Sequence, residues 1–132
     1  MTFNQGDDAE LRHLTARLHQ EGWANHVTVE RLVDEWWTLA NCVDVYPLTI
    51  DDYTNDLTGR DALERVLSWV SPALRERIKD AVETADADFR SRTVEDDGES
   101  LNRYFRIDES SGWWWHRRPA GGPLSDYLRR NP

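Results

Sequence analysis

Apolar residues recur every three or four positions through the first two thirds of the chain, which is the spacing of amphipathic helices. This pattern predicts helices over residues 8–20, 28–44 and 72–92. The stripe of the second helix is the clearest and consists of Val29, Leu32, Val33, Trp36, Ala40 and Val43. Trp37 lies beside that stripe, so we expect at least one of the two adjacent tryptophans at its edge.

Capping residues mark where several of these helices begin. Thr28 is a predicted N-cap, and Ser71 followed by Pro72 combines a cap with proline at the first helical position. A final short helix is predicted to begin at Pro123. Residues 1–8 show no apolar period and are expected to be a frayed N-terminus.

The segment between the second and third of these helices predicts two short helices separated by a turn. Thr49 and Asp52 resemble a capping box with Asp in place of Glu. One or two helical turns are expected to follow this box. Asn55 and Gly59 then turn the chain, and Thr58 starts a separate helix.

The last third of the chain changes character. Residues 94–100 break every period, and we expect residues 93–112 to form an exposed loop region. Residues 113–132 are expected to form a Trp- and Arg-rich tail packed on a helical core of residues 9–92. A short hairpin of residues 102–107 and 112–117 is an alternative, because aromatic residues favour strands. We predict one mostly α domain, a small bundle of four to five helices with an irregular Trp-rich C-terminal segment.

Charge narrows the classes of partner. The 132 residues hold 25 Asp and Glu against 16 Lys and Arg, a formal net charge of −9. An acidic chain lacks the cations that nucleic acid and anionic membranes require, so neither is an expected partner. The first residues carry no apolar signal segment, and a single cysteine supports neither an internal disulfide nor a paired-thiol zinc site. We expect a cytoplasmic protein with no metal and no cofactor.

Acidic residues concentrate in the middle of the chain. Between residues 44 and 64 six acids face one cation, a local charge of −5; the acids are Asp44, Asp51, Asp52, Asp56, Asp61 and Glu64. The spacing lacks the pattern of a calcium loop. One interpretation is structural, with Asp and Thr capping helices and Arg60 pairing with Asp56 or Asp61. The other is a surface that binds a basic protein.

No motif in the sequence indicates an enzyme. Nucleophile elbows and phosphate-binding glycine loops are absent, and Cys42 lies at the end of an apolar stripe, as expected of a core thiol. No catalytic residue is therefore predicted. A small enzyme that uses Asp56, Asp61 or His116 stays open as an alternative, and it requires those groups to line a concave pocket.

Three consecutive tryptophans, Trp113 to Trp115, precede His116, Arg117, Arg118 and Pro119. Residues 113–132 carry four Arg and one Asp, a net charge of +3 on an acidic protein. Such a tail fits docking against the acidic face of its own chain. Three adjacent indoles cannot easily all face one core, so at least one is expected near the surface. An exposed indole could also form the interface of a homodimer.

The order of these motifs resembles a group of small bacterial hypothetical proteins. These proteins share a Y-x-N-D-L-x-x-R-D core and a later W-W-x-R-x-P element, and the resemblance covers residues 28–120. The matching positions are Tyr53, Asn55, Asp56, Leu57, Arg60, Asp61, Trp114, Trp115, Arg117 or Arg118, and Pro119. The group implies no activity.

In size and charge the chain also resembles immunity proteins of bacterial toxin systems, which are small, acidic, cytosolic domains that bind a basic toxin. We therefore predict a non-enzymatic domain that binds a basic protein, such as a cognate toxin. A homo-oligomeric structural or regulatory subunit is the alternative. The expected contact residues are Trp37, Asp51, Asp52, Tyr53, Asn55, Asp56, Arg60, Asp61, Trp114 and Arg117.

Overall fold

The computed structural model describes residues 5–130 of the chain, and helices dominate this range. The elements in order are η1 (Gln5–Asp7), α1 (Asp8–Gln20), α2 (Val29–Cys42), α3 (Ile50–Trp69), α4 (Pro72–Ser91), β1 (Thr93–Glu95), η2 (Trp113–His116), β2 (Arg117–Pro119) and α5 (Gly122–Arg130), where η denotes a short 3-10 helix. The prediction of a mostly α bundle with a Trp-rich C-terminal segment is confirmed.

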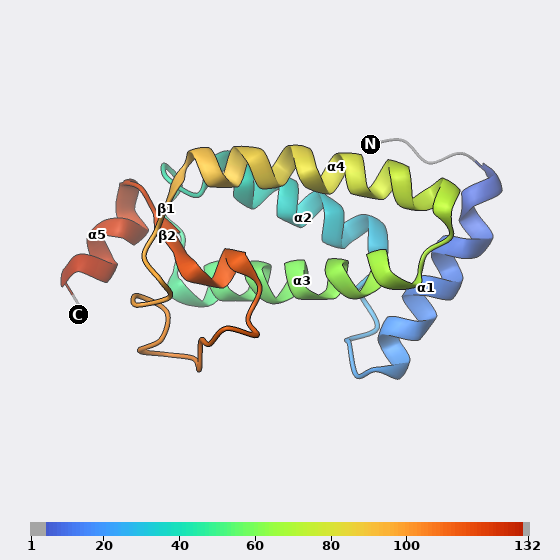
Figure 1. The fold of residues 1–132 in the computed structure, drawn as a ribbon, viewed down its shortest axis with the longest axis horizontal. Helices are drawn as coiled ribbons and strands as arrows, with labels where there is room; N and C mark the ends of the chain where they lie inside the picture. Colours follow the sequence, from blue (N-terminus) through green and yellow to red (C-terminus); the bar gives the residue numbers. More distant parts are fainter. Residues whose placement is uncertain (1–4, 131–132) are drawn as a thin grey trace.

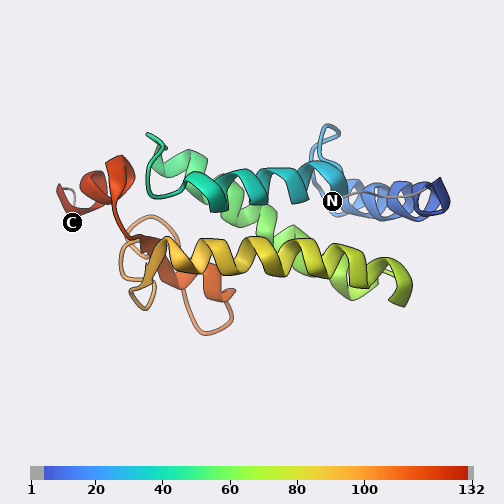
Figure 2. The same ribbon diagram turned by 90° about the horizontal axis from the view of Figure 1, so that it is seen from above.

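Helices α2, α3 and α4 form an elongated three-helix bundle (Figure 1). Helix α3 runs antiparallel to the other two, and α1 lies across one end of the bundle (Figure 1). Helix α5 lies at the opposite end, as the perpendicular view also shows (Figure 2). Among residues 5–130, no helix has both the length and the apolar character needed to cross a membrane.

Large aromatic side chains fill the centre of the bundle. Trp36 from α2, Tyr53 from α3 and Phe89 from α4 are all buried, and the rings of Trp36 and Phe89 lie 4.8 Å apart between centroids. Burial of such side chains contributes about 1.5–3 kcal/mol each, which makes them a main source of stability. The predicted apolar stripe of α2 faces this core, and the adjacent Trp37 is half-buried at its edge, as expected.

Two predicted caps are confirmed in detail. The Thr28 hydroxyl accepts the backbone N–H of Arg31 at 3.1 Å at the start of α2. At the start of α3, Thr49 and Asp52 form the reciprocal capping box, with bonds of 3.0 and 3.3 Å. Each cap satisfies amide donors that the first helical turn leaves without a partner.

The start of α4 is satisfied in another way. Pro72 occupies the first turn as predicted, but the Ser71 side chain makes no capping bond within its own helix. Instead Glu10 of α1 accepts both the backbone N–H of Ser71, at 2.7 Å, and its hydroxyl, at 2.6 Å. This contact ties α1 to the turn between α3 and α4.

The predicted break within residues 50–69 is wrong, because α3 is one continuous helix of 20 residues. Asn55 and Gly59 do not turn the chain but lie inside the helix. Thr58 starts no new helix, since its hydroxyl donates to the carbonyl of Thr54 at 2.9 Å. Gly59 has a packing role: a Cβ there would lie 3.3 Å from Leu32, so the glycine lets α2 approach α3 closely.

Strand pairing occurs in the C-terminal third, but not where it was expected. Strand β1 pairs antiparallel with β2 in the register Thr93 to Pro119 and Glu95 to Arg117. The alternative hairpin of residues 102–107 and 112–117 is therefore wrong. The prediction that all of residues 93–112 form an exposed loop is also wrong, because Thr93 and Leu101 are buried.

The N-terminal prediction is partly tested. Residues 1–4 of the expected frayed segment lie outside the described residues, whereas residues 5–8 are helical. Asp7 is buried and forms an ion pair with Arg77 of α4. Fraying of residues 5–8 is therefore contradicted, because this contact fixes η1 against the bundle.

Candidate functional site

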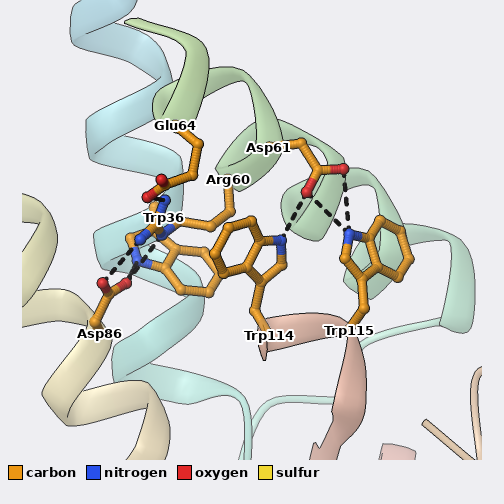
Figure 3. Close-up of polar contacts among 7 residues, drawn as sticks. All are labelled: Trp36, Arg60, Asp61, Glu64, Asp86, Trp114 and Trp115. Carbon is orange, nitrogen blue, oxygen red and sulfur yellow. Dashed lines mark hydrogen bonds and ion pairs between the residues drawn. The ribbon is translucent and has the colours of Figure 1, made fainter. Parts of the chain in front are cut away.

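A buried polar network connects the three long helices (Figure 3). Arg60 of α3 donates from Nε and Nη2 to the two carboxylate oxygens of Asp86 in α4, at 3.0 and 2.9 Å. Its Nη1 reaches Glu64 at 2.7 Å, and Trp36 of α2 donates its indole N–H to Asp86 at 2.9 Å. The buried charges of this network are thus compensated by several hydrogen bonds each.

The Trp-rich segment docks onto the same stretch of α3. Trp114 lies against the guanidinium of Arg60, 4.2 Å from its ring centroid, and donates its indole N–H to Asp61 at 2.9 Å. Trp115 donates to both oxygens of Asp61, at 3.0 and 3.1 Å (Figure 3). Burial raises the pKa of Asp61, although the two indole donors oppose that effect. Within the predicted tail of residues 113–132, the tryptophans thus pack on α3, whereas residues 131 and 132 lie outside the described residues.

These contacts correct the list of expected contact residues. Tyr53, Arg60 and Trp114 are 0%, 3% and 4% exposed, so they cannot contact a partner on the surface. Arg60 also pairs with neither Asp56 nor Asp61, because Asp86 and Glu64 hold its guanidinium. The charge of Arg60 serves the interior of the bundle.

Arg117 is likewise engaged within the chain. Its guanidinium donates to the hydroxyl of Thr93 at 2.8 Å and to the carbonyls of Thr93 and Arg90 at 3.1 and 3.2 Å. Its own carbonyl accepts the hydroxyl of Tyr53 at 3.0 Å. Burial raises the pKa of that phenol, which therefore stays a neutral donor. Arg117 thus anchors the tail and does not serve as a free contact residue.

The three tryptophans do not form an exposed patch. Trp114 and Trp115 are buried, and Trp113 is half-buried, in line with the expectation that one indole would lie near the surface. The Trp113 ring lies 5.9 Å from Phe89 and 3.9 Å from the guanidinium of Arg90. The feature that suggested a homodimer is thus largely interior, and oligomerisation stays a prediction.

Two acids of the −5 segment, Asp52 and Asp56, line a cleft between α2 and α3. This acidic cleft has a volume of about 590 Å³. Helix α3 supplies one wall and α2 the other, and the loops before and after α2 complete it. The lining residues are Trp23, His26, Val27, Leu32, Glu35, Tyr46, Leu48, Asp52, Asn55, Asp56, Thr58 and Gly59.

The geometry of α3 explains why its polar side chains gather there. Asp52, Asn55, Asp56 and Gly59 are spaced by three, one and three residues, so they form one stripe on the helix surface. The opposite face of α3 carries the buried core residues. Glu35 approaches from α2, which gives the cleft three carboxylates and no Lys or Arg among its lining residues.

Two other clefts in residues 5–130 mix both signs of charge. A cleft of about 420 Å³ beside α1 contains Asp8, Arg12 and Glu30. A cleft of about 540 Å³ beside the Trp-rich segment contains Asp61 and Arg65 together with a further arginine. The acidic cleft differs from these because its lining holds no Lys or Arg. Arg31, outside the lining, pairs with Glu35 at 2.9 Å, so Asp56 is the acid of the cleft that is left without a hydrogen-bond or ion-pair partner among residues 5–130.

Asp56 is the carboxyl group most changed by this environment. Burial raises its pKa to about 7, and the charges of Glu35 and Asp52 add to the shift. The other titratable groups near it are Cys42 at the end of α2 and, in the cleft lining, His26 and Tyr46. Among residues 5–130, the Asp56 carboxylate forms no hydrogen bond or ion pair. It is therefore poised to accept a donor from outside.

The cleft contains three of the expected contact residues, Asp52, Asn55 and Asp56. Asp51 is exposed on the first turn of α3 but lies outside the lining, and so does the half-buried Trp37. The remaining acids of the −5 segment are engaged elsewhere: Asp44 pairs with Arg92 at 3.1 Å, Glu64 with Arg60, and Asp61 with the two indoles.

Sequence reasoning missed Glu35, Trp23 and Tyr46 as parts of the site. One signal was present: the stripe of polar residues on α3 would have been visible if residues 50–69 had been predicted as one helix. The contribution of the loops carries no such signal, because it depends on how α2 and α3 pack. Over the described residues, no group of three or more His, Cys, Asp or Glu side chains could hold a metal ion.

Comparison of the chain with protein-family models, with curated proteins and with solved structures gives no match in any of the three. The resemblance to small bacterial proteins and to immunity proteins therefore stays a prediction.

Proposed function

We propose that this protein is a non-enzymatic binding domain that recognises a basic protein through the acidic cleft. The single observation that carries the proposal is the cleft itself, which three carboxylates from two helices line with no Lys or Arg in the lining. Like charges held close together destabilise one another, and a cationic partner relieves that repulsion. Complementary charge also speeds encounter and disfavours acidic competitors.

The overall charge supports the same partner class. A net charge of −9 attracts basic proteins over a distance set by ionic strength, so association should weaken as salt increases. The position of Glu35, Asp52 and Asp56 on two packed helices supports a preformed site, because binding then requires little ordering of the backbone. A basic bacterial toxin neutralised in the cytoplasm is the partner that best fits a small acidic domain of this kind.

The experiment is affinity capture of the tagged protein from its native cytosol at low salt, with identification of proteins that elute at high salt. We expect one stoichiometric basic protein, and expression of that protein alone should arrest growth. Recovery of the bait alone, or of acidic proteins that resist high salt, would contradict the proposal. A captured basic protein that is harmless to cells would remove the toxin assignment but keep the binding function.

A second candidate rests on the raised pKa of Asp56. A carboxyl group with a pKa of about 7 in a concave site is suited to general acid–base chemistry. His116 and Asp61 do not join it, since neither lines the acidic cleft. A screen of small-molecule hydrolysis that finds an activity abolished by Asp56→Asn would favour this candidate over binding.

A further inference from the structure

The acidic cleft combines a free carboxylate with apolar and aromatic walls. Asp56 lies on one wall without a partner among residues 5–130, whereas the other two acids are partly engaged. Asp52 accepts the backbone N–H of Thr49 at 3.3 Å, and Glu35 accepts from Arg31 at 2.9 Å. A ligand of this cleft therefore needs donors for Asp56 first, with the other carboxylates supplying additional charge.

Apolar side chains make up much of the rest of the lining. Trp23 is half-buried in the loop before α2, and Tyr46 is 58% exposed in the loop after it. Val27, Leu32 and Leu48 add aliphatic surface. A compact, strongly hydrated cation would leave these walls unused. A flat cation on a long aliphatic stem contacts both the acids and the walls.

The protein already holds one of its own arginines in an arrangement of this type. The guanidinium of Arg60 donates to the carboxylates of Asp86 and Glu64 and lies against the ring of Trp114 (Figure 3). The indole of Trp36 also donates to Asp86. Arginine fits such sites because its planar guanidinium donates to two oxygens at once and stacks on aromatic rings. The acidic cleft offers the same groups without an arginine of the chain in its lining.

We propose that the acidic cleft receives an arginine side chain of the basic partner, with the guanidinium donating to Asp56, the partly engaged Glu35 adding negative charge beside it, and an aromatic wall against its flat face. This inference rests on the proposed function and specifies the partner residue that the site recognises. Lysine is the weaker ligand, because its ammonium group has no planar face and no forked pair of donors.

The test uses two capped tripeptides, acetyl-Gly-Arg-Gly-amide and acetyl-Gly-Lys-Gly-amide, added to the ¹⁵N-labelled protein at equal ionic strength. We expect the arginine peptide to shift the indole signal of Trp23 and the amide signals of Asn55 and Gly59. It should bind about fivefold more tightly than the lysine peptide. That ratio corresponds to about 1 kcal/mol, which we attribute to stacking on the aromatic wall and to donation from two N–H groups at once.

Two double variants distinguish the loss of the cleft acids from the loss of overall negative charge. The Glu35→Gln/Asp56→Asn double variant should weaken the arginine peptide about tenfold, because it removes the charged acceptors. Glu76→Gln/Asp80→Asn removes the same charge from exposed positions of α4 and should stay within about twofold of wild type, since only long-range attraction changes. Tyr46→Leu keeps an apolar wall and should reduce the preference for arginine.

The outcomes distinguish the two proposals. Equal binding of both peptides, or signal changes away from the cleft, would overturn arginine recognition. That result would leave the proposed function standing if capture of a basic protein still depends on Glu35 and Asp56. If the cleft binds the arginine peptide specifically, but capture of a basic protein is unchanged when Glu35 and Asp56 are replaced, the arginine site is supported and the proposed function is overturned.

Discussion

The ionised form of Asp56 destabilises the folded protein. Its pKa is raised to about 7 by burial and by the charges of Glu35 and Asp52, so the folded state holds this proton more tightly than the unfolded chain does. Stability therefore falls as pH rises from about 4 to about 7 and then stays constant, as linkage requires for an acid with a raised pKa. Such a cost at a half-buried carboxyl that lines a cleft is typical of a group retained for binding.

Replacement of Asp56 should reveal that cost. We expect Asp56→Asn to raise the free energy of unfolding by about 1–2 kcal/mol near pH 8, with solvent screening already discounted, and to have almost no effect near pH 4. Urea unfolding at both pH values measures it. The exposed Asp80→Asn is the control and should change stability by less than about 0.5 kcal/mol at either pH. Destabilisation by Asp56→Asn near pH 8 would contradict the account.

Asp86 has the opposite role, because it compensates a buried charge. Asp86→Ala leaves Arg60 without its principal partner and Trp36 without its acceptor, so we expect a loss of about 3–5 kcal/mol of stability. Glu83→Ala, which removes only an exposed contact to Lys79 at 3.8 Å, should cost less than about 0.5 kcal/mol. Chemical denaturation compares the two variants, and similar small losses would show that the network is unimportant for stability.

Helix α3 shows where prediction from the sequence succeeded and where it failed. Its start was predicted correctly because a capping box is a local motif of Thr49 and Asp52. Its continuity was missed because Asn55, Thr58 and Gly59 favour turns locally, whereas packing against α2 and α4 overrides those preferences. The error divided the stripe of Asp52, Asn55 and Asp56 and so hid the cleft.

The structure of the C-terminal segment was predicted incorrectly for a related reason. Its tryptophans pack on α3, where the indoles of Trp114 and Trp115 donate to Asp61. The expected pairing of the tail arginines with acids of the core is not seen among residues 5–130, because Arg117 donates to Thr93 and to backbone carbonyls and Arg129 pairs with Asp126 of its own helix. The partners of β2 and the burial of Trp114 depend on pairing with distant parts of the chain. Neither spacing nor composition specifies such pairing, so the short strands were assigned to the wrong residues.

Gly122 fixes α5 at the end of the bundle. Its φ is 85°, and a Cβ would lie 2.2 Å from the carbonyl oxygen of Asp44, just beyond α2. We expect Gly122→Ala to cost at least about 1 kcal/mol through backbone strain and this clash. Gly121→Ala is the matched control, because its Cβ would meet nothing within 4 Å. Equal stability of both variants in urea unfolding would contradict this role.

Seven acids of α2, α3, α4 and the loop after α2 fall into two groups. Asp44, Asp61, Glu64 and Asp86 hold arginines or indoles and stabilise the fold. Glu35, Asp52 and Asp56 line one cleft, where apolar loops and two helices surround them. The first group is compensated within the fold, whereas in the second group Asp56 has no ion-pair partner among residues 5–130, and the proposed cation-binding function rests on that difference.

The most direct measurement of this account is capture from the native cytosol with three baits: wild type, Glu35→Gln/Asp56→Asn and Glu76→Gln/Asp80→Asn. The two variants have the same net charge and differ only in which surface is neutralised. The account predicts that the basic partner is lost from the cleft variant, by about tenfold or more, and retained by the α4 variant. Equal recovery by all three baits, or loss from the α4 variant alone, would contradict it.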